Sequence, residues 1–189
     1  MTKIILHGGF TSEDNELNRG YYREITKDLK DGATVLAVLF AREKEEHSKL
    51  FQDEIQKLTA SIDKHLDIVQ ASEDKFINQV KEADVIVIRG GDTSKLIKTF
   101  KQYPDFMESA RDKVIGGSSA GAYLFSKYYH SASKGKVFEG LGILPIRIVC
   151  HHNSKEFKVK KSAVEQLEKY PNDLELVILK DYEWRVFEI

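Results

Sequence analysis

Short apolar runs rich in branched residues alternate with charged stretches along the chain. The apolar runs lie at 3–7, 33–40, 66–70 (the weakest), 83–90, 113–117, 146–152 and 174–180. Each run has the length of a β-strand, and continuous apolar runs are typical of strands that are buried on both faces of a sheet. The pattern therefore predicts seven strands of a mostly parallel sheet.

Several of the charged stretches between these runs have helical spacing. The clearest is 43–65, and the segments 76–83 and 155–170 show the same pattern. The apolar positions of the first are Leu50, Phe51, Ile55, Leu58 and Ile62. Strands that alternate with amphipathic helices predict an α/β fold, a three-layer sandwich with helices on both faces of the sheet. Because no linker or repeat divides the chain, we expect one domain over residues 1–189.

The composition, 41% hydrophobic and 31% charged, is that of a soluble globular protein. Lys and Arg (29) balance Asp and Glu (30) to a net charge of −1, which does not favour a nucleic-acid partner. No apolar run approaches the ~20 residues of a membrane span, and the first ten residues do not resemble a signal peptide. A single cysteine, Cys150, fits a reducing compartment. We expect a cytoplasmic protein, a monomer or small homo-oligomer, without membrane partners.

Polar or glycine-rich segments follow four of the predicted strands. They are GGDTSKL (90–96), GSSAGA (117–122), the pair His151–His152, and Asp181. Ligands of open α/β sheets bind beyond the carboxyl ends of the strands. A nucleophile, a base, an acid and backbone N–H donors, the groups that acyl transfer needs, are thus all predicted at one edge of the sheet. Within GGDTSKL, Asp92 is expected to cap a helix that begins at Thr93.

The segment Gly117–Gly121 matches G-x-S-x-G with Ser119 at its centre. In this motif the nucleophile lies on a sharp strand-to-helix turn, and small residues on either side let the strand and the helix approach. The turn exposes the serine Oγ and places the N–H of Ala120 at a helix N-terminus. Ser118, at the x position, is expected to point elsewhere, as a cap of the helix. The alternative is a glycine-rich turn that cradles a phosphate.

A serine nucleophile needs a base, and the chain has six histidines. They are His7, His47, His65, His130, His151 and His152. His47 and His65 are expected on or near the polar face of a long helix, exposed to solvent, and His130 at the end of the helix that Ser119 opens, about a helix length (~15 Å) away. His7, at the end of the first strand, is a weaker rival of the pair that follows the strand 146–150. Neighbouring residues of an extended chain face opposite sides, so spacing alone does not choose between His151 and His152.

The third group of a triad orients the imidazole and supports its positive charge. Asp181, just after the last long strand, gives the chain order serine, histidine, acid. Glu183 is the alternative, and Glu156 lies further back. The histidines show no metal-ligand spacing, and Cys150 is expected to be a core residue.

The segments GGDT (90–93), GSSAGA (117–122), GLGILP (140–145) leading to IRIVCHH, and ILKD (178–181) together resemble the peptidase E group. These are serine dipeptidases of the S51 family, which also holds cyanophycinase. The resemblance covers residues 83 to about 186. It implies a flavodoxin-like fold similar to class I glutamine amidotransferases, and a serine-histidine-acid triad without a metal or organic cofactor.

Carried over by position, the resemblance places the nucleophile on Ser119, the histidine on His151 and the acid on Asp181. It places the oxyanion donors on the backbone N–H groups of Gly91 and Ala120. The implied function is hydrolysis of dipeptides or short peptides at the N-terminal residue, with Asp-X dipeptides as the substrates of the best-known members.

The sequence departs from those members in three ways. Asp181 stands where the best-known dipeptidase has glutamate. No arginine-bearing loop after the histidine matches theirs, although lysines of 155–161 could attract an acidic substrate if they do not simply form a solvated helix face. Asp92 stands where asparagine is common. Two other functions stay open: another serine acyl hydrolase (an esterase or amidase), or a non-catalytic module that binds a phosphate or nucleotide.

Overall fold

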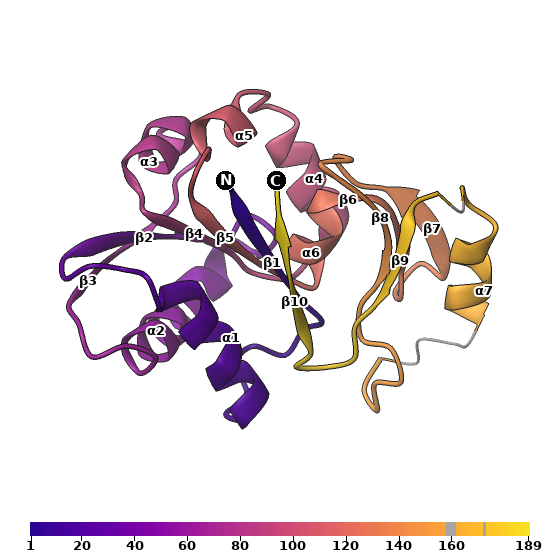
Figure 1. Cartoon of the computed structure of the whole chain (residues 1–189), viewed down its shortest axis with the longest axis horizontal. Coiled ribbons are helices and arrows are strands. Elements are labelled where there is room, and N and C mark those ends of the chain that lie inside the picture. The colour runs from indigo at the N-terminus through magenta and orange to yellow at the C-terminus, as the bar shows by residue number, and fades with distance from the viewer. Residues whose placement is uncertain (158–161, 172) are drawn as a thin grey trace.

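The computed structural model describes residues 1–157, 162–171 and 173–189. Ten strands are present in the described residues (Figure 1). They are β1 (Lys3–His7), β2 (Ala33–Val38), β3 (Leu66–Gln70), β4 (Val85–Ile88), β5 (Val114–Ser118), β6 (Ser126–Ser131), β7 (Lys136–Glu139), β8 (Leu144–Val149), β9 (Glu175–Ile178) and β10 (Trp184–Glu188). All seven predicted strands are confirmed, while β6, β7 and β10 were not predicted.

Seven helices connect these strands in the same described ranges. They are α1 (Glu16–Thr26), α2 (Lys44–Thr59), α3 (Phe76–Glu82), α4 (Thr93–Phe100), α5 (Phe106–Ser109), α6 (Ala120–Phe125) and α7 (Ser162–Glu168). The predicted helices at 43–65 and 76–83 correspond to α2 and α3. Of the helix predicted at 155–170, the described part is α7, and residues 158–161 lie outside the described residues. None of the described helices is long and apolar enough to cross a membrane.

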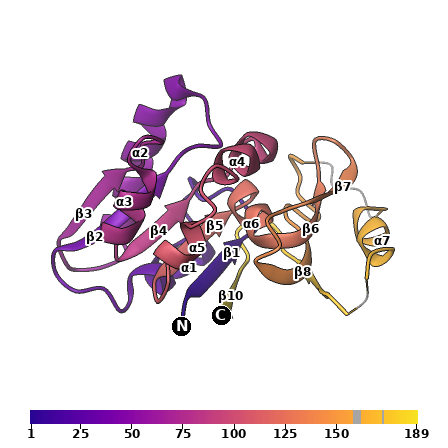
Figure 2. The same ribbon diagram turned by 90° about the horizontal axis from the view of Figure 1, so that it is seen from above.

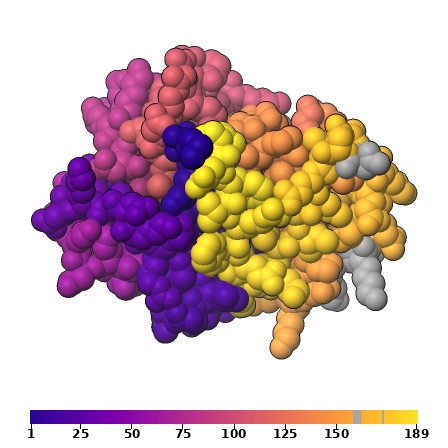
Figure 3. All heavy atoms as spheres, in the orientation of Figure 1, coloured from indigo at the N-terminus to yellow at the C-terminus, as the bar shows by residue number. Residues whose placement is uncertain are grey.

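The larger sheet has the strand order β10-β1-β5-β4-β2-β3. Four of its five strand pairings are parallel, and the one between β1 and β10 is antiparallel. The carboxyl ends of β1, β5, β4 and β2 therefore meet at one edge, which carries His7, Ser118 and the loops that begin at Leu39 and Arg89. Through the β1–β10 pair the chain ends lie side by side on one face of the molecule (Figure 3).

A second sheet has the order β7-β6-β8-β9, with β8 parallel to both β6 and β9. The segments predicted as strands at 146–152 and 174–180 belong to this sheet rather than to the larger one. It forms because α6 ends at Phe125 and the chain continues directly into β6. His130, expected at the end of a helix, therefore lies on β6, where it is buried.

The helices α3 to α6 cover one face of the larger sheet, with α4 and α6 on the side of the second sheet, whereas α1 and α2 cover the opposite face (Figures 1 and 2). The main core contains side chains from both sheets and from these four helices, among them Phe76, Phe100 and Ile146. A smaller cluster around Leu167 packs α7 on the outer face of the second sheet. The predicted α/β class with mostly parallel strands flanked by helices is thus confirmed, with a second sheet added to the three predicted layers.

Candidate active site

Ser119 lies on the turn between β5 and α6 in a backbone conformation that is rare for a residue with a side chain. Its φ is 50° and its ψ is −104°. A Cβ atom on Gly117 would lie 2.7 Å from the carbonyl oxygen of Gly121, and one on Gly121 would lie 2.6 Å from the carbonyl oxygen of Ile88, so neither position has room for a side chain. This is the strained strand-to-helix turn that the motif predicts.

Ser119, His151 and Asp181 form a chain of hydrogen bonds. Ser119 Oγ lies 2.9 Å from His151 Nε2, and His151 Nδ1 lies 2.8 Å from Asp181 Oδ1. Ser119 comes from the larger sheet, whereas His151 and Asp181 follow β8 and β9 of the second sheet. The two sheets therefore bring together three residues that are 32 and 30 positions apart. Neutral His151 with its proton on Nδ1 donates to Asp181 and accepts from the serine hydroxyl.

His151 is buried under aromatic side chains. Phe10 makes an edge contact with its ring at 5.1 Å between centroids, and Phe157 lies at 4.5 Å. Burial lowers the pKa of His151 below its ordinary 6.5, while the hydrogen bond and the charge of Asp181 act to raise it. The imidazole is therefore neutral at neutral pH and can accept a proton.

The structure also distinguishes between the alternatives that spacing left open. His151 is not extended, as the strand prediction assumed, but has a φ of 57° in a turn beyond β8, and this turn aims its ring at Ser119. Glu183 accepts from the backbone N–H of Lys180 at 2.8 Å rather than from a histidine. His7 is occupied elsewhere, because Nδ1 accepts from Gly9 N and Nε2 lies 2.8 Å from Asn18 Oδ1.

Strained backbone is concentrated around this site. Six non-glycine residues of the described ranges have a positive φ, and only Asp112 lies far from the site along the sheet. The other five are Phe10, Ser119, His151, Asn153 and Tyr182. Such strain persists where the surrounding structure imposes it and clusters at functional sites. The backbone alone thus points to the same place as the side chains.

The backbone N–H groups of Gly91 and Ala120 have no acceptor within the described part of the chain. Ala120 is the first residue of α6 and is buried. Buried backbone donors are nearly always paired, so the N–H of Ala120 is suited to an oxygen of a bound molecule, and the exposed Gly91 provides a second N–H in the lining of the same cavity described below. Ser118 does not cap α6 as expected, and its Oγ instead accepts from Gly90 N at 3.0 Å.

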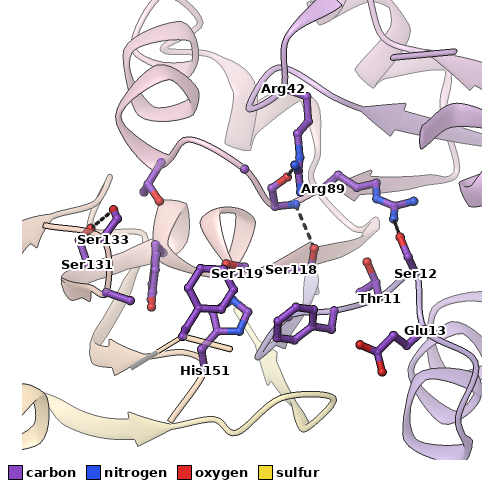
Figure 4. Close-up of a pocket in the computed structure, with 18 residues that line it drawn as sticks. Thr11, Ser12, Glu13, Arg42, Arg89, Ser118, Ser119, Ser131, Ser133 and His151 are labelled. Carbon is purple, nitrogen blue, oxygen red and sulfur yellow. Dashed lines mark hydrogen bonds between the residues drawn. The ribbon is translucent and has the colours of Figure 1, made fainter. Parts of the chain in front are cut away.

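A cavity of about 330 Å³ opens beside Ser119 and His151 (Figure 4). It is lined by residues from both sheets, which include Thr11, Ser12, Glu13, Arg42, Arg89, Gly91, Ser131 and Ser133. The sequence predicted Gly91 at this edge but neither arginine. Arg89 is buried and pairs with Asp53 at 2.7 Å and Glu54 at 2.8 Å, so its charge is balanced within the protein. Arg42 is more exposed and lies at the end of β2.

Three further predictions concern residues near the site. Asp92 caps α4, since its Oδ1 accepts from Lys95 N at 2.9 Å. Cys150 is a buried core residue, and burial raises the pKa of its thiol. His65 is exposed, as expected, whereas His47 is half-buried. None of these four side chains takes part in the hydrogen-bonded chain of Ser119, His151 and Asp181.

A model of peptidase family S51 matches residues 4–188. The structure is similar to that of a peptidase from an acI-B1 Actinobacterium, with a TM-score of 0.75 and 20% identity over 99% of this chain and 83% of that one. It is also similar to a putative peptidase E protein from Listeria monocytogenes EGD-e, with a TM-score of 0.69 and 17% identity over 99% and 97%. A comparison with curated proteins found no match. The structural likeness shows the fold, and because the family model spans nearly the whole sequence, the chain belongs to peptidase family S51.

Proposed function

We propose that this protein is a serine dipeptidase, which removes the N-terminal residue from dipeptides or short peptides through an acyl-enzyme on Ser119. The observation that carries the proposal is the hydrogen-bonded chain from Ser119 Oγ through His151 to Asp181, next to a cavity. Membership of a peptidase family supports a hydrolase of this class.

In the first step, Ser119 Oγ attacks the scissile carbonyl carbon while His151 Nε2 takes its proton. Asp181 holds the Nδ1 proton and stabilises the imidazolium that forms. The carbonyl oxygen gains negative charge and is bound by the unpaired N–H groups of Ala120 and Gly91. One such donor contributes about 10²–10³ to the rate in serine hydrolases. His151 then gives its proton to the leaving amine, and the peptide bond breaks.

In the second step, water replaces the amine. His151 takes a proton from the water as its oxygen attacks the acyl carbon, and then returns a proton to Ser119 Oγ as the ester bond breaks. The products are a free carboxylic acid and the regenerated serine. The strained turn at the N-terminus of α6 keeps Ser119 Oγ accessible in both steps.

The size of the cavity supports a small substrate. Its volume of about 330 Å³ is at the lower end of the ~300–1,000 Å³ range of small-molecule sites. A dipeptide is therefore a better fit than a folded protein or an extended chain. The proposal extends to an acidic first residue, as in Asp-X dipeptides. The positively charged Arg42 in the cavity lining supports this preference.

The test is release of amine from a panel of X-Leu dipeptides and their N-blocked counterparts. We expect the wild-type protein to cleave the free dipeptides only, and Ser119→Ala to abolish cleavage. Ser48→Ala, on the exposed face of α2, is the matched control and should retain full activity. The preferred X residue then gives the specificity.

A second measurement separates the alternatives. An organic fluorophosphonate reacts covalently with activated serines. Mass spectrometry of the intact protein should show one phosphonyl group on each wild-type molecule and none on Ser119→Ala. Labelling together with cleavage of esters but of no peptide would indicate another acyl hydrolase. Neither labelling nor turnover would contradict the proposal and favour a binding module.

A further inference from the structure

The peptide group between Gly90 and Gly91 is held from outside the sheet by one side chain. Arg42 Nε donates to the carbonyl oxygen of Gly90 at 2.6 Å. The guanidinium is fixed in turn by Glu46, whose Oε1 lies 3.3 Å from Arg42 Nη1. Glu46 belongs to the capping box at the start of α2, so the arginine is anchored to a helix terminus.

The residues on either side of this peptide group are also fixed. Gly90 N donates to Ser118 Oγ at 3.0 Å, and Asp92 N donates to the carbonyl oxygen of Ala41 at 2.8 Å. Between them, Gly91 N donates to no acceptor within the described residues, and Gly91 lines the cavity. Hydrogen bonds therefore hold the N–H groups of Gly90 and Asp92, whereas none of the described residues accepts from the N–H of Gly91 between them.

The geometry of the peptide bond connects these observations. None of the described peptide bonds is cis, and in a trans peptide the C=O and the following N–H point in opposite directions. A carbonyl of Gly90 that is held toward Arg42 therefore turns the N–H of Gly91 away from Arg42. Figure 4 shows Arg42 on one side of this segment and Ser118 and Ser119 on the other.

We propose that Arg42 is a positioning residue for the oxyanion hole: it aims the Gly91 N–H toward the reacting carbonyl by binding the carbonyl oxygen of the same peptide group. This inference rests on the proposed function. The positive charge of Arg42 also polarises the Gly90–Gly91 amide, which makes its N–H a stronger donor to a developing oxyanion. Arg42 itself does not touch the substrate in this role.

The test compares Arg42→Met, which keeps the aliphatic stem, with the wild type on a neutral dipeptide such as Ala-Leu. We expect kcat to fall about 10- to 100-fold with KM little changed, because the donor stays but loses its orientation. The affinity for a peptide aldehyde, which forms a tetrahedral adduct with the serine, should fall by a similar factor. Arg23→Met, which removes an exposed arginine ion pair on α1, is the matched control and should retain wild-type kinetics.

Three results would overturn the inference. They are an unchanged kcat in Arg42→Met, a rise in KM without loss of kcat, or a loss restricted to acidic dipeptides, which would make Arg42 a specificity residue. If Arg42→Met unfolds at a lower temperature than the wild type, Arg42→Ala with added guanidinium ion decides: recovery of kcat supports the positioning role, and no recovery contradicts it. A wild type that cleaves no peptide would instead refute the proposed function.

Discussion

The pKa of His151 depends on how far its surroundings exclude water. Burial beneath Phe10 and Phe157 lowers its pKa below 6.5, and Asp181 offsets part of this shift. The base is active only when neutral, so kcat/KM should rise with pH through a midpoint below 6.5 and stay constant above it. Initial rates with a dipeptide from about pH 4 to 8 measure this limb.

The burial of His151 also predicts how the midpoint of the pH–rate profile responds to mutation. Phe157→Ser opens the site to water, so the pKa of His151 should return toward 6.5 and the midpoint should shift upward. Wild-type and variant profiles that coincide would show that another group controls the limb. A wild-type midpoint above 6.5 would contradict the direction of the shift.

Asp181 and Glu183 provide a matched pair of carboxylates after β9. Asp181 contacts His151, whereas Glu183 contacts the backbone of Lys180. We expect Asp181→Asn to lower kcat by about 10⁴, because an amide no longer supports the imidazolium or the correct tautomer. Glu183→Gln keeps an oxygen acceptor for Lys180 N and should retain nearly wild-type kcat. Steady-state kinetics of both variants on one dipeptide make the comparison, and equal effects would contradict it.

The sequence was informative at those site residues that immediately follow a strand. Ser119 could be singled out because its G-x-S-x-G motif follows a strand whose carboxyl end lies at the edge where ligands of such sheets bind. Spacing left Asp181 and Glu183 as alternatives, and Gly91 was assigned by the family resemblance. His151 could be separated from His152 only by the family resemblance, since a turn with positive φ replaces the strand alternation there. Arg42 carried no signal, because its role depends on a backbone carbonyl 48 residues away.

At the scale of elements, the loop between β1 and α1 closes over the histidine. Gly9 has a φ of 125°, and a Cβ atom there would lie 2.0 Å from His151 Cε1. Gly9→Ala should therefore displace the imidazole and lower kcat/KM by at least about 10², since a displacement of this kind is enough to misalign reacting groups. Gly32→Ala is the control, because Gly32 also has a positive φ of 75° but has nothing within 4 Å of the added atom.

Both glycine variants should lose stability, because alanine is strained at positive φ, and Gly9→Ala should lose more because its added Cβ also overlaps His151. Only Gly9→Ala should also lose catalytic activity. Thermal unfolding and kcat/KM measured on the same preparations separate the two effects. An active Gly9→Ala would mean that the loop moves aside without consequence for His151.

The strands that the sequence did not predict are short, lack a continuous apolar run, or follow a helix without a break. β6 continues directly from α6, so its residues seemed to extend that helix as far as His130. β7 has four residues and β10 lies half-exposed at the antiparallel edge of the larger sheet, so neither forms a continuous apolar run. On α2, the most buried polar side chain is Glu54, whose pairing with Arg89 is a long-range contact that helical spacing does not reveal.

For the molecule as a whole, the second sheet is what completes the site. The larger sheet provides the serine, the loop over the histidine and the Gly90–Gly91 peptide, whereas β8 and β9 provide His151 and Asp181. The two sheets share one core through α3 to α6. Relative movement of the sheets would therefore change the distance between Ser119 and His151, so packing of this core and geometry of the site are coupled.

His7 connects the site to the stability of the whole fold. It is fully buried on β1, and its carbonyl oxygen accepts from Ser119 N at 2.9 Å. Burial lowers its pKa to about 4, the hydrogen bond to Asn18 acts to raise it, and the charges of His151 and Asp181 act in opposite directions. Between pH 6.5 and about 4 the unfolded chain therefore binds a proton that the folded protein does not, so the free energy of unfolding falls as the pH falls through this window.

This single group should contribute a loss of about 3 kcal/mol across that window, with no further loss below it. His7→Gln removes the titration while it keeps a polar side chain beside Asn18, so its free energy of unfolding should vary less with pH than that of the wild type, even if it is lower throughout. Urea unfolding at several pH values measures both slopes. Parallel curves for wild type and His7→Gln would show that the acid sensitivity of the fold arises elsewhere, with His151 as the next group to examine because its pKa is also lowered by burial.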